Sequence, residues 1–160
     1  MYRTVVLTIS DRSAQGVRED KSGPEAARLL EAAGYQVADT RILPDEQALL
    51  EEELRNICDQ HLADLVLTTG GTGFSMRDRT PEATLAVAHR QVPGISEALR
   101  AYSLTITPRA MLSRGVSVIR EQTLIINLPG SPKAVRESLE YLLPALGHGL
   151  DILTGTVTDG

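Results

Sequence analysis

The chain has little of the material from which several classes of protein and site are built. Its 160 residues include one cysteine and no tryptophan, and aromatic residues make up only 3%. A single cysteine, Cys58, excludes an internal disulfide and a cysteine-rich zinc site. No apolar run reaches the length of a membrane span, and the strand-like pattern from Tyr2 onward indicates no leader peptide. We therefore expect one cytoplasmic domain over residues 1–160, with a mostly aliphatic core.

Positive charge is also scarce. Sixteen basic residues stand against 21 acidic ones, which gives a formal net charge of −5. This balance argues against non-specific binding to nucleic acid, because such binding depends on basic side chains that neutralise phosphates. A local basic cluster would still be able to hold a polyphosphate. We expect neither a nucleic-acid partner nor a membrane partner.

Strand and helix patterns alternate along the chain. Short apolar runs predict strands over residues 5–9, 35–43, 63–69, 116–119 and 123–128. Amphipathic patterns predict helices over 24–33 and 46–62, from 80, after 93–94, and a broken C-terminal helix over 132–143 and 145–153. Near-continuous apolar strands between helices indicate a parallel sheet that is covered on both faces. The predicted fold class is therefore α/β: a three-layer α/β/α single domain with a mostly parallel sheet.

The most informative segment joins a buried strand pattern to a helix through a glycine-rich loop. Residues 68–83 read TTGGTGFSMRDRTPEA. Three glycines in four positions allow the backbone to approach an anion closely, although a simple tight connection would use the same residues. Thr80 is the predicted N-cap of the following helix, with Pro81 at the first helical position. A helix N-terminus favours anions, so the segment is a candidate anion cradle with Asp78 beside it.

Two common phosphate-binding fingerprints do not fit this loop. A P-loop requires a lysine followed by serine or threonine directly after its last glycine, and that pair is missing here. Met76 stands where the dinucleotide-binding pattern needs its third glycine. Ordinary kinase and dehydrogenase functions are disfavoured accordingly.

In a parallel sheet, the loops that follow the strands meet at one edge, where ligands bind. Four such loops are predicted, at residues 10–12, 44–45, 70–79 and 129–131. Three of them carry an aspartate: Asp11, Asp45 and Asp78. Acidic side chains beside anion-receptive helix ends suit a Mg²⁺ ion that bridges carboxylates and phosphates. Each aspartate also has a structural alternative, since Asp45 would suit a helix cap, Asp78 a turn and Asp11 an ordinary polar loop.

The glycine-rich segment resembles the molybdopterin adenylyltransferase family, which comprises the bacterial Mog and MoaB proteins and the G domains of gephyrin and its plant counterpart. The resemblance rests on T-G-G-T-G followed by R-D-x-T-P-E-A. Four more blocks follow family order, namely Ile9–Arg12, Leu43–Glu46, Met111–Arg114 and Leu128–Lys133. Two departures are Arg18, where an aromatic residue is common, and the variable insert 74–76. The resemblance implies a molybdopterin-binding-domain-like form of the predicted fold.

The reaction that the resemblance implies is Mg²⁺-dependent transfer of AMP from ATP to molybdopterin in molybdenum cofactor biosynthesis, giving adenylyl-molybdopterin and pyrophosphate. The essential aspartates of the family fall on Asp45 and Asp78, which we expect to hold Mg²⁺ and to be the catalytic pair. The residues expected to bind the nucleotide are Gly70, Gly71, Thr72, Gly73, Pro129, Gly130 and Ser131. The residues expected to bind the substrate are Ser10, Asp11, Arg12, Arg77, Thr80 and Ser113. Arg114 and Lys133 are further candidates for phosphate contacts.

Two positions bear on whether the chain is active. Weak or inactive relatives tend to lose the arginine and the threonine that stand here as Arg77 and Thr80, so their presence favours an active enzyme. A non-catalytic, pterin-binding MoaB-like relative stays open as the alternative. A general nucleotide-binding regulatory domain is a third alternative, which leaves the blocks at Ser113 and at 129–133 unexplained. The resemblance also leads us to expect a homotrimer and a molybdenum-insertion partner protein.

Overall fold

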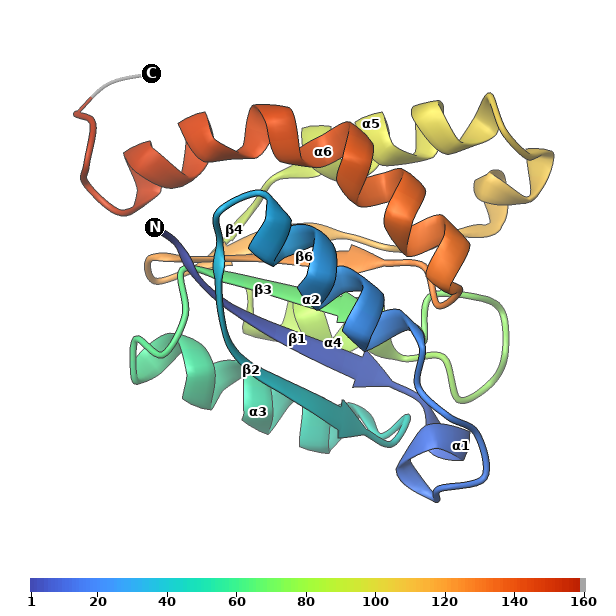
Figure 1. The fold of residues 1–160 in the computed structure, drawn as a ribbon. Coiled ribbons are helices and arrows are strands. Elements are labelled where there is room, and N and C mark those ends of the chain that lie inside the picture. Colours follow the sequence, from blue (N-terminus) through green and yellow to red (C-terminus); the bar gives the residue numbers. More distant parts are fainter. Residues whose placement is uncertain (159–160) are drawn as a thin grey trace.

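The computed structural model describes residues 1–158 as a six-stranded sheet between two layers of helices (Figure 1). The last two residues of the domain predicted over 1–160 lie outside the described residues. The strands are β1 Arg3–Ile9, β2 Gln36–Leu43, β3 Leu65–Thr69, β4 Arg90–Gln91, β5 Ser117–Arg120 and β6 Thr123–Leu128. The helices are α1 Asp11–Ala14, α2 Ser22–Ala32, α3 Gln47–Asp59, α4 Thr80–Val87, α5 Pro93–Leu104 and α6 Pro132–Leu153, with a 3₁₀ helix η1 at Pro108–Leu112.

The sheet is mostly parallel, which confirms the predicted fold class. Its strand order is β2-β1-β3-β6-β5-β4, and the first four strands are mutually parallel. Strand β5 pairs antiparallel with both β6 and β4. The hairpin between β5 and β6 turns at Glu121, whose φ is +53°. The carboxyl ends of β1, β2, β3 and β6 therefore meet at one edge of the sheet (Figure 1).

Alternation of side chains along the strands divides the core into two aliphatic clusters. Val6 of β1 and Leu67 of β3 face the layer formed by α2, α5 and α6. Val5 and Leu7 of β1 face the layer formed by α3 and α4. Because successive side chains point to opposite faces, an almost continuous apolar strand is required when both faces are covered. Within residues 1–158, no helix is both long and apolar enough to cross a bilayer.

The C-terminal helix corrects one prediction. Helix α6 is continuous from Pro132 to Leu153, with Pro144 inside it, whereas the sequence predicts a break there. A proline removes one main-chain hydrogen bond and usually kinks a helix. Here, buried leucines lie on both sides of the proline, among them Leu139 and Leu146. Packing of this apolar face against the sheet holds the helix together across Pro144.

Two helix starts also differ from prediction. Helix α2 begins at Ser22 instead of residue 24, because the Asp20 carboxylate accepts hydrogen bonds from the amides of Ser22 and Gly23. Thr80 is the first residue of α4 and not its N-cap, which is Arg79. The Thr80 amide donates to the Gly71 carbonyl (3.2 Å), so the glycine-rich loop folds back onto the helix start. The short elements α1, β4 and η1 are not predicted by the sequence.

Candidate functional site

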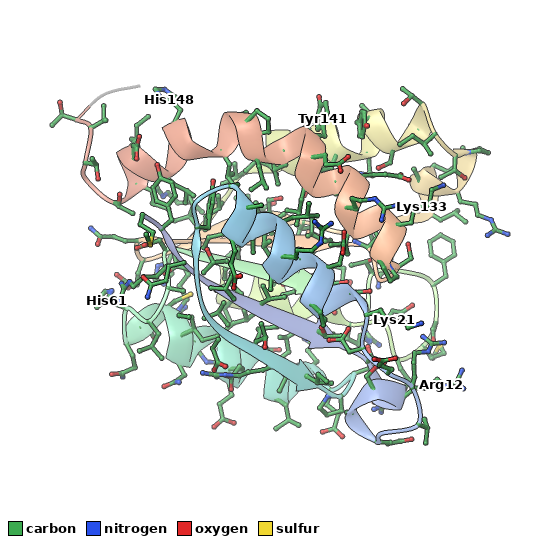
Figure 2. All side chains as sticks on the ribbon, in the orientation of Figure 1. Arg12, Lys21, His61, Lys133, Tyr141 and His148 are labelled. Carbon is green, nitrogen blue, oxygen red and sulfur yellow. The ribbon has the colours of Figure 1, made fainter. Side chains whose placement is uncertain are left out.

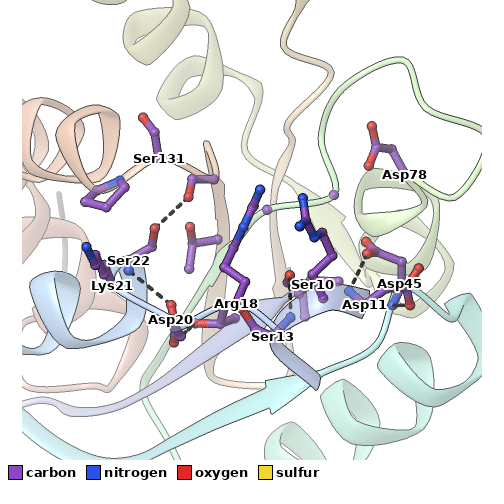
Figure 3. Close-up of a pocket in the computed structure, with 18 of the residues that line it drawn as sticks. Ser10, Asp11, Ser13, Arg18, Asp20, Lys21, Ser22, Asp45, Asp78 and Ser131 are labelled. Atoms are coloured by element: carbon purple, nitrogen blue, oxygen red, sulfur yellow. Dashed lines mark hydrogen bonds between the residues drawn. The ribbon is translucent and has the colours of Figure 1, made fainter. Parts of the chain in front are cut away.

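A cavity of about 860 Å³ lies at the carboxyl edge of the parallel strands (Figure 3). Loops that follow β1, β2, β3 and β6 all contribute to its wall, as the sequence predicts. The predicted site residues that line it are Ser10, Asp11, Arg12, Asp45, Gly70, Gly71, Arg77, Asp78, Gly130 and Ser131. The predicted site residues outside its lining are Thr72, Gly73, Thr80, Ser113 and Pro129. Its volume suits a ligand of nucleotide size.

The glycine-rich loop packs too closely against its surroundings to carry a side chain at Gly71. A Cβ atom there would lie 2.2 Å from Thr80 Oγ1 and 3.1 Å from Asp45 Oδ1, and the φ of Gly71 is +70°. Both facts require glycine. Among residues 1–158, the amides of Gly71, Thr72 and Gly73 donate to no protein acceptor. The loop therefore presents unused N–H donors, and an anion can accept hydrogen bonds from them.

Arg114 braces this loop from outside the cavity. Its guanidinium donates to the carbonyls of Gly73 (2.9 Å) and Asp78 (2.8 Å) and to the Glu82 carboxylate (2.6 Å). Its amide donates to the Thr72 carbonyl (2.9 Å). The hydrogen bonds to Glu82 raise the pKa of Arg114 and lower that of Glu82. These contacts occupy the guanidinium, so the structure places Arg114 as a support of the loop and not in the cavity wall.

One carboxylate oxygen of Asp45 accepts a hydrogen bond and the other accepts none from residues 1–158. Oδ2 accepts from the Asp11 amide (3.0 Å). Oδ1 is buried and has no hydrogen-bond partner among the described residues. Burial, together with the nearby charges of Asp11 and Asp78, raises the pKa of the Asp45 carboxyl above its usual value. The Asp45 side chain does not cap α3, so the capping alternative is wrong.

Asp78 lies at the end of the glycine-rich loop, directly after Arg77. Its Oδ2 accepts from the Ser75 amide (2.9 Å), an arrangement that stabilises the turn before α4. The same oxygen would lie 3.0 Å from a Cβ atom on Gly73. The turn-stabilising alternative is thus correct, and Asp78 nevertheless lines the cavity with Asp45.

The carboxylates fit a Mg²⁺ ion that is held by few protein ligands. Asp45 Oδ1 is a buried anionic oxygen without a partner among residues 1–158. In the described part of the chain, no group of three or more His, Cys, Asp or Glu side chains is arranged to hold a metal. Mg²⁺ commonly uses one or two carboxylates and completes its shell with phosphate oxygens and water. The donor set therefore suits Mg²⁺ that arrives with a phosphorylated substrate, and it does not suit a metal held by protein ligands alone.

Asp11 and Arg77 form an ion pair in the lining of the cavity. Arg77 Nε and Nη2 donate to Asp11 Oδ2 and Oδ1, at 2.9 and 3.0 Å. These bonds lower the pKa of Asp11 and raise that of Arg77. Arg77 comes from the glycine-rich loop and Asp11 from the first residue of α1. The pair therefore joins the loop after β3 to the loop after β1.

The segment between α1 and α2 adds cavity residues that sequence reasoning missed as a group. Arg18, Asp20, Lys21 and Ser22 all line the cavity, and Arg18 points into it (Figure 3). Asp20 also accepts from Thr8 Oγ1 (2.7 Å), and Ser22 Oγ donates to the Gly130 carbonyl (2.5 Å). The run D-K-S-G-P at 20–24 is a turn and helix-start signal that could have located them.

Basic side chains gather at the cavity end of the molecule. Arg12, Arg18 and Lys21 line the cavity and form no salt bridge with any of residues 1–158. Figure 2 shows Arg12 and Lys21 at the end where β1 points, far from His61 and His148. Lys133 lies outside the lining and pairs with Glu137 (3.5 Å). Despite its net negative charge, the chain therefore offers a polyphosphate three cations.

Ser113 lies outside the cavity that holds the aspartates, and it borders a different cavity together with Pro129. This second cavity, of about 50 Å³, lies between α5, η1 and α6 and is also lined by Arg100 and Ser103. Its Oγ accepts from the Gly115 amide (3.3 Å). Arg100 donates to the carbonyls of Ser113 (3.4 Å) and Gly115 (2.7 Å). The structure therefore does not bring Ser113 into the cavity that holds the aspartates.

Comparison with known proteins agrees with this geometry. Residues 5–148 match the family model described as a probable molybdopterin binding domain. The chain is 48% identical over 149 residues to a molybdopterin adenylyltransferase of Escherichia coli, covering 91% of this chain and 76% of the relative. It is 49% identical over 147 residues to that of Haemophilus influenzae, with coverage of 91% and 75%. The solved structure of the molybdopterin biosynthesis enzyme MoaB from Thermus thermophilus is 46% identical, with a TM-score of 0.91 over 97% of this chain and 98% of that one. The chain therefore belongs to the probable molybdopterin binding domain family, together with these adenylyltransferases.

Proposed function

We infer that the chain transfers AMP from ATP to molybdopterin in the biosynthesis of the molybdenum cofactor. Curated molybdopterin adenylyltransferases are 43–49% identical to it over most of its length. The observation that carries the inference is that Asp45 and Asp78 line one cavity, beside a glycine-rich loop with unused amide donors. Such a site is suited to a metal-bound polyphosphate.

The reaction asks for positioning and charge neutralisation more than for covalent chemistry by the protein. An oxygen of the terminal phosphate of molybdopterin attacks the α-phosphorus of ATP. A new P–O bond forms, the bond to the β-phosphate breaks, and pyrophosphate leaves with the electron pair. Negative charge gathers on oxygens around the α-phosphorus, so preorganised donors supply most of the catalysis.

Asp45 and Asp78 would hold Mg²⁺ in this reaction. The bound ion neutralises phosphate charge and orients the reacting groups. Asp45 contributes Oδ1, which has no other partner among the described residues and is fixed in place through Oδ2. Asp78 contributes from the end of the glycine-rich loop, where the Ser75 amide donates to its Oδ2. Both carboxylates are held by the fold before substrate arrives, which lowers the cost of ordering them.

The remaining phosphate oxygens have main-chain and basic partners in the same cavity. The amide of Gly71, which donates to no acceptor among residues 1–158, belongs to a residue of the cavity wall and would donate to a nucleotide phosphate. The loop after β6 supplies Ser131, whose hydroxyl caps α6 by accepting from the Ala134 amide (3.2 Å). Arg12, Arg18 and Lys21 add positive charge on the α1 side. Together these groups offer a polyphosphate hydrogen-bond donors and positive charge in one cavity.

We also propose an oligomeric state, a cellular location and a partner protein for the enzyme. The resemblance to Mog and MoaB proteins supports a homotrimer, a cytoplasmic location and a molybdenum-insertion partner that receives the product. Sedimentation equilibrium of the purified chain tests the first of these. A monomer at micromolar concentration would contradict it.

Magnesium-dependent turnover with carboxylate variants tests the proposed chemistry. The wild-type protein, Asp45→Asn and Asp78→Asn are each supplied with molybdopterin and ATP while Mg²⁺ is titrated. We expect turnover to require Mg²⁺ and to fall at least about 100-fold in each folded variant, the upper range for loss of a metal-positioning group. Undiminished adenylylation by Asp78→Asn would remove that residue from the reaction.

The alternative function is that of a non-catalytic, pterin-binding MoaB-like relative, which the same assay tests. A binding-only relative would retain molybdopterin and release no pyrophosphate at any Mg²⁺ concentration. Equilibrium dialysis with molybdopterin, run beside the turnover assay, separates the two functions.

A further inference from the structure

We propose that Asp11 is a positioning residue: held by Arg77, it orients Asp45 and so couples the glycine-rich loop to the carboxylate that holds the metal. The proposal rests on the proposed function for the role of Asp45. It differs from the role of substrate contact that the family resemblance implies for Asp11 and Arg77. Three sets of contacts carry it.

The first contact set joins Asp11 to Asp45 in both directions. The Asp11 amide donates to Asp45 Oδ2 (3.0 Å), and the Asp45 amide donates to Asp11 Oδ1 (2.9 Å). Two reciprocal bonds between residues 34 apart fix the Asp45 side chain against the start of α1. With Oδ2 of Asp45 held in this way, its Oδ1 lies close to Gly71. A Cβ atom placed on Gly71 would lie 3.1 Å from this oxygen.

The second contact set ties Asp11 to the loop that carries Asp78. Arg77 binds both carboxylate oxygens of Asp11, and Arg77 directly precedes Asp78 in the chain. A two-pronged bond between guanidinium and carboxylate fixes orientation as well as distance. The position of the glycine-rich loop and the orientation of Asp45 are therefore set by the same carboxylate.

The third observation is that the ion pair between Arg77 and Asp11 contributes little to the stability of the fold. The side chains of Arg77 and Asp11 are 56% and 28% exposed, so their ion pair is screened by water and contributes little to stability. Both oxygens of Asp11 are already used, by Arg77 and by the Asp45 amide. Asp11 therefore has little capacity left for a direct ligand, and its contacts serve Asp45.

A double-mutant cycle with Asp11→Asn, Arg77→Met and the double variant tests the coupling. Asparagine keeps an oxygen for the Asp45 amide and loses the charge that binds Arg77. We expect each single variant to need about 10–100-fold more Mg²⁺ for half-maximal turnover, as for other groups that orient metal ligands. We expect the KM for molybdopterin to stay unchanged. We expect the double variant to need no more Mg²⁺ for half-maximal turnover than the more impaired of the two single variants. Arg77→Lys should recover part of the loss.

Two readouts do not depend on turnover. Mn²⁺ binding to the protein with ATP and no molybdopterin, followed by electron paramagnetic resonance, should weaken by the same factor in each single variant. Trypsin should cut after Arg77 or Arg79 several-fold faster in Asp11→Asn than in the wild type, because the loop is no longer tied down. Asp59→Asn is the matched control, since Asp59 forms an equally two-pronged pair with Arg120 (3.0 and 3.0 Å) away from the cavity.

The outcomes separate the proposal from its alternatives. Losses that multiply in the double variant, or a raised KM for ATP or molybdopterin at an unchanged Mg²⁺ requirement, would show that Arg77 contacts substrate directly and would overturn the proposal. Trypsin cleavage and Mn²⁺ affinity that match those of the wild type in Asp11→Asn would overturn it as well. A wild-type protein without adenylylation would refute the proposed function, and the Mn²⁺ and trypsin measurements would still decide the positioning role.

Discussion

Replacing Gly71 by alanine should damage the site in a way that the structure allows to be calculated. The new Cβ atom would lie 2.2 Å from Thr80 Oγ1 and 3.1 Å from Asp45 Oδ1, at a φ of +70°. A left-handed backbone costs an alanine about 1–2 kcal/mol relative to glycine. Crowding of a packed region adds about 1–3 kcal/mol. We therefore expect Gly71→Ala to lower the free energy of unfolding by about 2–5 kcal/mol.

Gly34 provides a control for the backbone contribution alone. Its φ is +89°, and no described atom lies within 4 Å of a Cβ atom placed there. Gly34→Ala should therefore cost only the backbone share, about 1–2 kcal/mol. Urea unfolding followed by circular dichroism gives both values by linear extrapolation. Adding Thr80→Ala to Gly71→Ala removes the nearest atom and should restore part of the stability.

The result that would refute this reasoning is equal destabilisation by the two alanine variants. It would mean that the close approach of Gly71 to Thr80 and Asp45 is not a feature of the folded protein. Wild-type turnover by Gly71→Ala would contradict the account in a second way, because a displaced Asp45 should hold Mg²⁺ poorly.

Three further predictions follow from charges in the structure. Burial raises the pKa of Asp45, and only the ionised carboxylate holds Mg²⁺. As the pH is lowered, kcat/KM should therefore begin to fall at a pH above the usual aspartate pKa of about 3.9. An acidic limb of the pH profile at or below that value would contradict this prediction. Arg18→Gln should raise the KM for at least one phosphate-bearing substrate several-fold, more strongly at low salt, whereas Arg55→Gln on α3 should leave both KM values unchanged. The hydrogen bond to Asp151 raises the pKa of Tyr2 to about 12, so its contribution to stability is present below about pH 10 and is lost as pH rises toward 12. Urea unfolding across this range should show a steeper decline for the wild type than for Tyr2→Phe, and parallel declines would refute the assignment.

The sequence alone could locate the cavity because its position follows from topology. Alternating strand and helix patterns predict a parallel sheet, and a parallel sheet brings its strand-to-helix loops to one edge. Asp11, Asp45 and Asp78 could therefore be grouped without knowledge of any contact. The antiparallel edge strand β4, with only two residues, carries too little pattern to be predicted.

Contacts between distant segments account for what the sequence could not predict. Arg114 meets Gly73 across 41 residues, and nothing in its neighbourhood distinguishes a loop support from a phosphate ligand. Thr80 has the residue type of an N-cap, but the Gly71 carbonyl takes its amide. Pro144 has the character of a helix breaker, and only the packing of leucines on both sides explains why α6 continues. In each case tertiary packing outweighs a sound local preference.

The measurement that tests the central claim most directly is identification of the product formed from molybdopterin and ATP. The purified wild-type protein is incubated with both substrates and Mg²⁺, and the pterin is analysed by mass spectrometry while pyrophosphate is counted. We expect molybdopterin to gain one adenylyl group for every pyrophosphate released, and no pyrophosphate to form when molybdopterin is left out. Molybdopterin that is bound but recovered unmodified, with ATP intact, would contradict it.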